Sequence, residues 1–565
     1  MKTLQQILLA SSFALMPFCL HAQENHRWSL ENEGHIRWIP QKSEAHQDHI
    51  EMSGKSVSVV LRYGVENGRF TLNKSMVWPL LRTIPNNTHA SLMRRYGWDV
   101  LDMVSINGRA LTSEQVESIE LKGILKVVSN YDEGRRGQWK IIREYFPSTE
   151  QPALVESYQI INTGTKELAI ELPQINQKSV TDPKKGVTGS FCIETSIDKS
   201  GHFTLQAGES LTFGATLLAY KEGEKAPQID VQQEKNQRES LVNELMGKLV
   251  LETPDPIIDR MFAFSKIRGC ESIYETKGGP MHGPGGESYY AAIWANDQAE
   301  YINPFFPFVG YAYGNASALN SYLHFARFMN DEWKPIPSSI IAEGIDIWNG
   351  AGDRGDAAMI AYGASRYALA RGNKQEAETL WPLIQWCLEY CRRQLNPEGV
   401  VASDSDELEG RFPSGDANLC TSSLYYDALV SASYLCKELG KNGASTYLKQ
   451  ATTLRKNMER YFGAQVEDFE TYAYYKGNDI LRSWICIPLT VGIDERAEGT
   501  IQALFSPRLW TKDGLLTQAG SETFWDRSTL YALRGVYAVG ATEKATEFMK
   551  KYSATRLLGD HVPYA

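Results

Sequence analysis

The chain has 565 residues, of which 42% are hydrophobic and 22% charged, and its formal net charge is −10. This length exceeds what one hydrophobic core usually supports, so we expect two domains. The acidic balance and the lack of any Lys/Arg-rich run argue against nucleic acid and anionic membranes as partners. The sequence has no HExxH or CxxC motif and little His, so we expect no metal centre and no cofactor.

The first 22 residues predict a secretory signal peptide. Met1 and Lys2 precede an apolar run that ends near Leu20, and Ala22 supplies a small residue before the polar chain. The run is too short for a membrane span, which needs about 20 apolar residues. We therefore expect cleavage after Ala22, a periplasmic or secreted mature chain, and no membrane contact after cleavage.

Residues 23–225 predict a β-sandwich domain. Apolar and polar residues alternate over 56–63, 123–129, 139–146 and 202–205, and short Asn/Gly/Asp/Pro clusters separate these runs. Residues 153–162 and 167–172, joined by the turn 163–166, predict a β-hairpin. Many short strands without helices between them are typical of a sandwich. The polar stretch that follows predicts a linker over 226–250, part of it helical.

The remaining residues, 251–565, predict a helical domain with connections of alternating length. The expected helices are 256–272, 290–306, 314–330, 353–371, 375–395, 418–438, 442–462, 478–490, 494–506, 525–539 and 542–556. Gly-marked joints at 372, 440, 492 and 540 are tight, as expected of helix C-caps. The other connections, 273–289, 331–352, 396–417, 463–477 and 507–524, are long, and loops of this length are usually functional.

This alternation predicts an (α/α)6 toroid of helical hairpins, with tight joints on one rim and long loops on the other. Eleven helices make an odd number for a ring of hairpins. We therefore expect the sequence to lack its last loop and helix.

The first two long loops carry candidate sugar-binding and acidic residues. The Gly-rich segment 278–286 leads into Trp294, Asn296 and Asp297, which offer a stacking face and hydrogen-bonding groups. Asp297 is also open to a structural role as a buried cap. The second loop places carboxylates, an Arg and a Trp among glycines: Glu343, Asp346, Trp348, Asp353 and Arg354. Asp353 alternatively caps the following helix.

The third and fifth loops add further carboxylates beside aromatic residues. Glu407 and Glu409 flank Leu408, so in an extended loop their side chains point the same way; an exposed acidic loop is the alternative interpretation. Glu522 and Trp525 stand just before the helix at 525–539.

Carboxylates with Trp and Tyr, in the absence of a His, Cys or Ser nucleophile motif, best suit the cleavage of a glycosidic bond. That reaction needs one carboxylic acid to protonate the leaving oxygen and one carboxylate to activate water or attack carbon. Sugar faces stack on aromatic rings while Asp, Asn and Arg bind hydroxyls. The sequence therefore predicts a carbohydrate substrate, with Glu407, Glu409, Asp297 and Glu343 as catalytic candidates.

A β-sandwich, a linker and a helical toroid in this order resemble the six-hairpin glycosidase superfamily, which includes bacterial glucoamylases, α-L-rhamnosidases and disaccharide phosphorylases. Residues 294–301 and 350–356 are similar to the first two active-site loops of these enzymes. The resemblance implies a general acid in the loop between the fifth and sixth helices, here Glu407 or Glu409. It places the general base before a twelfth helix, beyond the residues given.

We expect an exported, inverting glycoside hydrolase, and three alternatives remain. A glycoside phosphorylase needs a basic phosphate pocket and intracellular phosphate, which a signal peptide disfavours. A polysaccharide lyase acts on acidic sugars, which so acidic a rim would repel. A non-catalytic glycan-binding protein is the third alternative.

Overall fold

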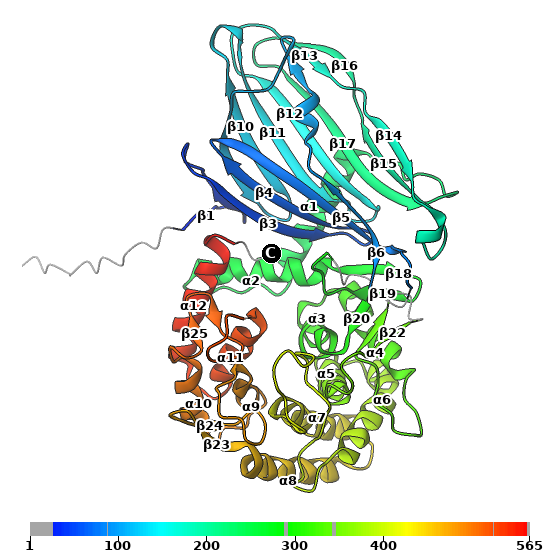
Figure 1. The fold of residues 1–565 in the computed structure, drawn as a ribbon, viewed down its shortest axis with the longest axis vertical. Helices are drawn as coiled ribbons and strands as arrows, with labels where there is room; N and C mark the ends of the chain where they lie inside the picture. The colour runs from blue at the N-terminus through cyan, green and yellow to red at the C-terminus, as the bar shows by residue number, and fades with distance from the viewer. Residues whose placement is uncertain (1–25, 87–88, 288–291, 342–345, 524, 562–565) are drawn as a thin grey trace, which may run out of the picture.

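The computed structural model describes residues 26–86, 89–287, 292–341, 346–523 and 525–561. The expected signal peptide and Glu343 lie outside these residues. Figure 1 shows two bodies along the long axis of the molecule: a layered β domain and, below it, a body made of helices. Among the described residues no helix is both long and apolar enough to cross a bilayer.

The β domain contains a nine-stranded antiparallel sheet and two four-stranded sheets. In spatial order the large sheet consists of β1 (Trp28–Leu30), β2 (Ile36–Trp38), β9 (Glu114–Leu121), β10 (Leu125–Asp132), β11 (Gln138–Pro147), β12 (Ala153–Asn162), β17 (Ser210–Lys221), β15 (Phe191–Ile197) and β14 (Asn176–Val180). The second sheet is β3 (His46–Ser53), β4 (Ser58–Glu66), β5 (Arg69–Arg82) and β6 (Ser91–Tyr96). The third is β16 (Gly201–Leu205), β13 (Leu168–Leu172), β7 (Ser105–Ile106) and β8 (Arg109–Ala110).

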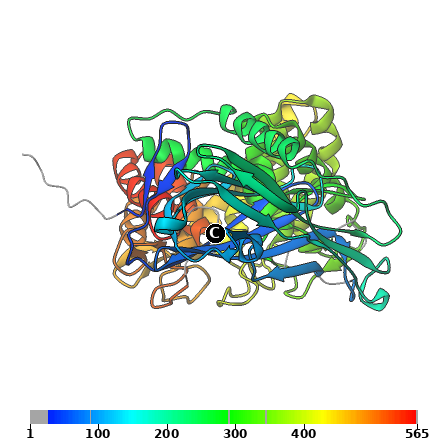
Figure 2. The ribbon, with the colours of Figure 1, turned by 90° about the horizontal axis from the view of Figure 1, so that it is seen from above.

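The sheets pack face to face, as the alternating sequence predicts. Buried side chains of β4, such as Val59 and Leu61, belong to the same core as Ile119 of β9 and Ile141 of β11. Seen from above in Figure 2, the strands lie in stacked layers over the helices. Alternating strands bury one face each, so two such faces close a common core.

The predicted hairpin between residues 153–162 and 167–172 is wrong. Strand β12 pairs with β11 and β17 in the large sheet, whereas β13 pairs with β16 and β7 in another sheet. The buried side chain of Asn162 holds the corner between them, because its Nδ2 donates to the carbonyl oxygens of Lys166 at 2.8 Å and Leu205 at 3.0 Å. A short turn thus changes sheets instead of closing a hairpin.

The expected linker is largely a packed helix, α1 (Val231–Gly247). Arg238 is fully buried and donates to the carbonyl oxygens of Gly123 and Ser53 in the β domain. Its Nη2 also donates to Oε2 of Glu271 on α2 (Pro256–Glu271) at 2.5 Å. The polar segment therefore forms a helix that packs between the two bodies, because the charges of the buried Arg238 and Glu271 side chains neutralise each other.

The helical body follows the predicted helices to within a few residues, apart from two segments. Beyond α2 they are α4 (Ala312–Ala326), α5 (Asp356–Arg371), α6 (Lys374–Arg393), α7 (Leu419–Glu438), α8 (Ala444–Phe462), α10 (Ala497–Leu504), α11 (Asp526–Ala538) and α12 (Thr542–Leu558). The expected helix 290–306 is instead a strand, a short π-helix η4 (Asp297–Ile302) and α3 (Asn303–Val309). The expected helix 478–490 is reduced to the 3-10 turn η6 (Ser483–Cys486) and α9 (Ile487–Thr490).

These helices form a circuit. Helices α3, α5, α7, α9 and α11 pack on one another in turn, and α12 packs against α2. In Figure 1 the first set lies toward the middle and the helices between them lie outside. The glycines expected at the tight joints, 372, 440, 492 and 540, all have positive φ, as αL helix caps require.

The long connections gather where the inner helices begin. Each contains short strands or isolated bridges: β18 (Ile273–Thr276), β19 (Gly279–His282), β20 (Ala292–Trp294), β21 (Ser339–Ile341), β22 (Ile347–Trp348), β23 (Gly463–Val466), β24 (Phe469–Tyr472), β25 (Trp510–Thr511) and β26 (Gly514–Leu515). Hydrogen bonds join neighbouring connections, for example from the amides of Asp404 and Ser405 to the carbonyl of Asp353, and from Ser483 to Thr517. The loops that carry the site residues predicted from the sequence therefore lie at this end of the circuit.

Candidate active site

Glu407 lies at the centre of a buried polar cluster. Its side chain has no solvent exposure, and its Oε2 accepts hydrogen bonds from the hydroxyl of Tyr301 at 3.0 Å, Nδ2 of Asn296 at 3.3 Å and Nη1 of Arg527 at 2.9 Å. The other oxygen, Oε1, is buried without a hydrogen-bond partner among the described residues. A proton carried by this carboxyl group would therefore reside on Oε1.

Asp297 shares two of these partners. Its Oδ1 accepts from Nη2 of Arg527 at 3.3 Å and from Nδ2 of Asn296 at 3.4 Å, so one guanidinium bridges both carboxyl groups. Burial raises the pKa of Asp297; Arg527 opposes the rise and the charge of Glu407 adds to it. The side chain of Asp297 is 22% exposed, so it is the member of the pair that solvent reaches.

The π-helix η4 places a third carboxyl group beside the pair. Glu300 is buried, its Oε2 accepts from the hydroxyl of Tyr531 on α11 at 3.1 Å, and its Oε1 has no partner among the described residues. Burial, reinforced by the charge of Glu407, raises the pKa of Glu300 well above its ordinary value. Two of the three neighbouring carboxyl groups, Asp297 and Glu300, thus have pKa values above their ordinary range.

Aromatic side chains form a wall next to this cluster. The ring centroid of Trp294 on β20 lies 5.1 Å from that of Trp348 on β22. Trp294 also contacts the ring of His89. The imidazole of His89, from the β5–β6 connection of the β domain, stacks on Trp294 at 5.0 Å with an interplanar angle of 15°. Burial lowers the pKa of His89 to about 4, so the ring is uncharged at neutral pH.

Arg354 joins the second and third loops. It is fully buried, and its Nη2 donates to Oδ1 of Asp356 at 2.8 Å and to Oδ1 of Asn296 at 3.3 Å. Its Nη1 donates to Oε1 of Glu409 at 3.1 Å, and the guanidinium lies 5.6 Å from the Trp294 ring centre. Glu409 is therefore tied to a cation, and of the two loop carboxylates it is Glu407 that enters the central cluster.

Asp353 and Asp346 make their side-chain hydrogen bonds with residues outside the Glu407 cluster. Oδ1 of Asp353 accepts from the Gly355 amide at 2.9 Å and Oδ2 accepts from the hydroxyl of Tyr390 at 2.6 Å, so this side chain is used within the protein. Its burial raises the pKa of Asp353 to about 6. Asp346 instead accepts from Nδ2 of Asn86 in the β domain at 2.7 Å.

Two residues of the fifth loop have different positions. The indole of Trp525 lies 4.8 Å from the guanidinium carbon of Arg527 and 5.6 Å from that of Arg411, so it borders the cluster. Glu522 is exposed. Its role in substrate binding stays a prediction.

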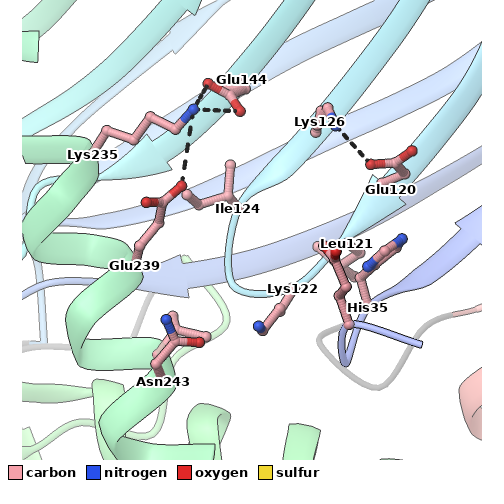
Figure 3. A pocket seen from close by; sticks show the side chains of 12 residues that line it. His35, Glu120, Leu121, Lys122, Ile124, Lys126, Glu144, Lys235, Glu239 and Asn243 are labelled. Atoms are coloured by element: carbon pink, nitrogen blue, oxygen red, sulfur yellow. Dashed lines mark hydrogen bonds and ion pairs between the residues drawn. The ribbon is translucent and has the colours of Figure 1, made fainter. Parts of the chain in front are cut away.

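Figure 3 shows a separate groove between α1 and strands of the large sheet. Four of its charged side chains are paired, with Lys126 bound to Glu120 at 2.9 Å and Lys235 to Glu144 at 2.6 Å. No Trp, Tyr or Phe lines it. We therefore assign the chemistry to the Glu407 cluster.

Comparison with known proteins finds likeness in structure but not in sequence. No family model matches the chain, and no curated protein matches it. A bacterial glucoamylase in complex with acarbose superposes with a TM-score of 0.52 and 12% identity, covering 93% of this chain and 91% of that one. A protein from the human microbiome assigned as a kojibiose phosphorylase gives 0.54 and 9%, with coverages of 94% and 89%.

The chain therefore shares the fold of these two proteins. Sequence reasoning missed Tyr301, Glu300 and Arg527, which lie on η4 and at the start of α11, close in sequence to the candidates it named. Asp297, Glu300 and Tyr301 are spaced i, i+3, i+4, which brings side chains to one helical face. That spacing was a usable signal. Asn86 and His89 come from the β domain, and nothing in their local sequence indicates a role.

Proposed function

We propose that this protein is an exported glycoside hydrolase that cleaves oligo- or polysaccharides by carboxylate acid–base catalysis. The observation that carries the proposal is the Asp297–Glu407 pair, two carboxyl groups from separate loops bridged by Arg527 beside the Trp294 wall. Glycosidic cleavage needs such a pair next to a surface on which a sugar can stack.

In this proposal Glu407 is the general acid. Because Oε2 accepts three hydrogen bonds, the unpartnered Oε1 is the atom that would carry the acidic proton. Asp297, the more exposed partner, is the carboxylate that activates the attacking water.

Water is proposed as the acceptor in preference to phosphate. A phosphorylase has to bind a phosphate dianion, which calls for cations that are free to receive it. In the described part of the site Arg354 already binds Asp356 and Glu409, and Arg527 binds Glu407 and Asp297. Both arginines are thus committed to carboxylates, which leaves hydrolysis as the better-supported reaction.

Three further parts of the proposal rest on the sequence and on the fold. The chain order of the packed helices supports an (α/α)6 toroid. The features of residues 1–22 support export. The resemblance to six-hairpin enzymes supports inversion at the anomeric carbon.

The deciding experiment is product analysis on a panel of natural glycans, with and without inorganic phosphate, in ¹⁸O-labelled water. We expect a reducing sugar that carries one ¹⁸O at the anomeric carbon, at a rate independent of phosphate. Proton NMR at early times should show the anomer opposite to that of the substrate. A sugar 1-phosphate that forms only when phosphate is added would replace this proposal with a phosphorylase.

A further inference from the structure

A second cavity opens at the end of the helical circuit opposite the Glu407 cluster. It has a volume of about 830 Å³ and is lined by α3, by the C-terminal halves of α5 and α7, and by α11. Arg534, on its wall, lies seven residues beyond Arg527 on α11, which corresponds to about 10 Å along a helix. Glu300 and Tyr301 form the layer between the cluster and this cavity.

The mouth of this cavity carries the two most exposed aromatic side chains of the described residues. Phe308 on α3 is 64% exposed and Tyr434 on α7 is 53% exposed, whereas the other described aromatic side chains are buried or half-buried. Exposed apolar surface that gathers at one place usually marks a binding site. The two most exposed aromatic rings of the described residues therefore lie at the same cavity.

The floor of the cavity is polar and preorganised. Nε of Arg366 donates to Oδ2 of Asp427 at 2.7 Å, and Nη2 donates to Oδ1 at 2.8 Å, which makes a bidentate pair across α5 and α7. The hydroxyl of Ser431 also donates to Oδ2, at 3.3 Å. Nη1 of Arg366 and the remaining lone pairs of Asp427 are left for a ligand.

We propose that this cavity is a second carbohydrate-binding site, which takes one or two pyranose units of a neutral oligosaccharide without cleaving them. The faces of a sugar ring stack on Phe308 and Tyr434, and its hydroxyls bind the Arg366–Asp427 pair. The volume lies within the range of about 300–1,000 Å³ typical of small-ligand sites. The proposal goes beyond the hydrolase function and does not depend on it.

A protein partner fits these features less well. Protein interfaces bury broad surfaces around aromatic anchors, whereas here the rings border a concave site with a fixed polar floor. The two carboxyl groups that line the cavity are already engaged, since Asp427 is bound to Arg366 and Glu300 accepts a hydrogen bond from Tyr531. The expected role is to hold a glycan chain near the enzyme.

The test uses the full chain with Trp294→Ala, which weakens binding at the Glu407 end. Maltoheptaose, cellohexaose, xylohexaose, mannohexaose and chitohexaose are titrated by calorimetry. We expect at least one to bind, and adding Phe308→Ala and Tyr434→Ala to raise its Kd at least tenfold. Tyr434→Phe alone, which keeps the ring, should leave the Kd within twofold. Ile39→Ala, which removes an equally exposed apolar side chain of the β domain, serves as the matched control.

Two further readouts separate the explanations. The double variant Phe308→Ala/Tyr434→Ala should cleave a short chromogenic glycoside at the wild-type rate. The calorimetric binding test does not require turnover, so it stands even if the catalytic proposal fails. Sedimentation velocity should show the same oligomeric state with and without these changes. The proposal is overturned if no oligosaccharide of the panel binds the Trp294→Ala protein. It is also overturned if the double change leaves every Kd unaltered, or if it alters the oligomeric state instead of sugar binding.

Discussion

Nη1 of Arg527 donates to Oε2 of Glu407 at 2.9 Å and thereby joins two residues that are 120 positions apart in the sequence. The same guanidinium reaches Asp297, so α11 compensates the charge of two loops at once. This contact connects the integrity of the helical circuit to the chemistry of the site.

Arg527→Gln should therefore lower both stability and activity. Loss of charged hydrogen bonds to two carboxyl groups should cost about 1–3 kcal/mol in the free energy of unfolding, measured by urea denaturation. Arg534→Gln is the matched control, because it removes an exposed arginine of the same helix that has no carboxylate partner in the described structure. Equal unfolding free energies for the two variants would show that Arg527 does not hold the cluster together.

His89 should contribute to substrate binding from the β domain. Its neutral ring stacks on Trp294, and such a pair is worth about 0.5–1.5 kcal/mol. We expect His89→Ala to raise KM roughly 2–10-fold while kcat changes less, with His202→Ala on β16 as an exposed control. If the KM of His89→Ala equals that of the wild type at all pH values above 5, the β domain does not contribute to substrate binding through this residue.

The buried carboxyl group of Asp353 should make stability depend on pH. Its pKa is raised from 3.8 to about 6, so between these values the folded chain binds more protons than the unfolded chain, and stability falls as pH rises. The stability of the wild type relative to Asp353→Asn should thus decrease by about 2 kcal/mol from pH 4 to pH 7. Asp468→Asn, which changes an exposed carboxylate, is the control. A stability difference for Asp353→Asn that does not vary with pH would contradict this assignment.

The ion pair between Arg238 and Glu271 should be a strong link between the β domain and the helices. Arg238→Met alone leaves a buried carboxylate without its partner and should cost about 3–5 kcal/mol. The double variant Arg238→Met/Glu271→Met should recover most of that loss, because it buries no unpaired charge. If the two single losses simply add, as a double-mutant cycle by urea denaturation would reveal, the pair is not coupled.

Local sequence patterns predicted most elements but not their partners. Apolar periodicity located α5 to α8, α11 and α12 to within a few residues, and glycine located their αL caps, because both signals lie in neighbouring residues. The same reasoning placed β12 and β13 in one hairpin. The buried amide of Asn162 directs the chain into another sheet, and its acceptor at Leu205 is 43 residues away.

The site residues likewise include some that local sequence indicates and others that depend on contacts distant in the sequence. Trp294, Asn296, Asp297, Arg354 and Glu407 could be chosen from loop composition, and the structure brings them together. Asp353 has the same residue type and setting, but it is bound to Tyr390, a contact with another helix that no loop pattern contains. His89 reaches Trp294 from 205 positions away, through the packing of one domain on the other.

The most direct test of the account is the effect of Glu407→Gln on substrates with different leaving groups. The change keeps the shape and the hydrogen bonds to Oε2 but removes the acidic proton. On the natural glycan that the wild type cleaves fastest, kcat/KM should fall about 10²–10⁴-fold. On an aryl glycoside of the same sugar with a dinitrophenolate leaving group, which needs little protonation, the loss should be less than tenfold. Glu409→Gln, at the Arg354-bound neighbour, should leave both rates within tenfold. Equal losses of Glu407→Gln on both substrates, or this pattern in Asp297→Asn instead, would contradict the assignment of Glu407 as the general acid.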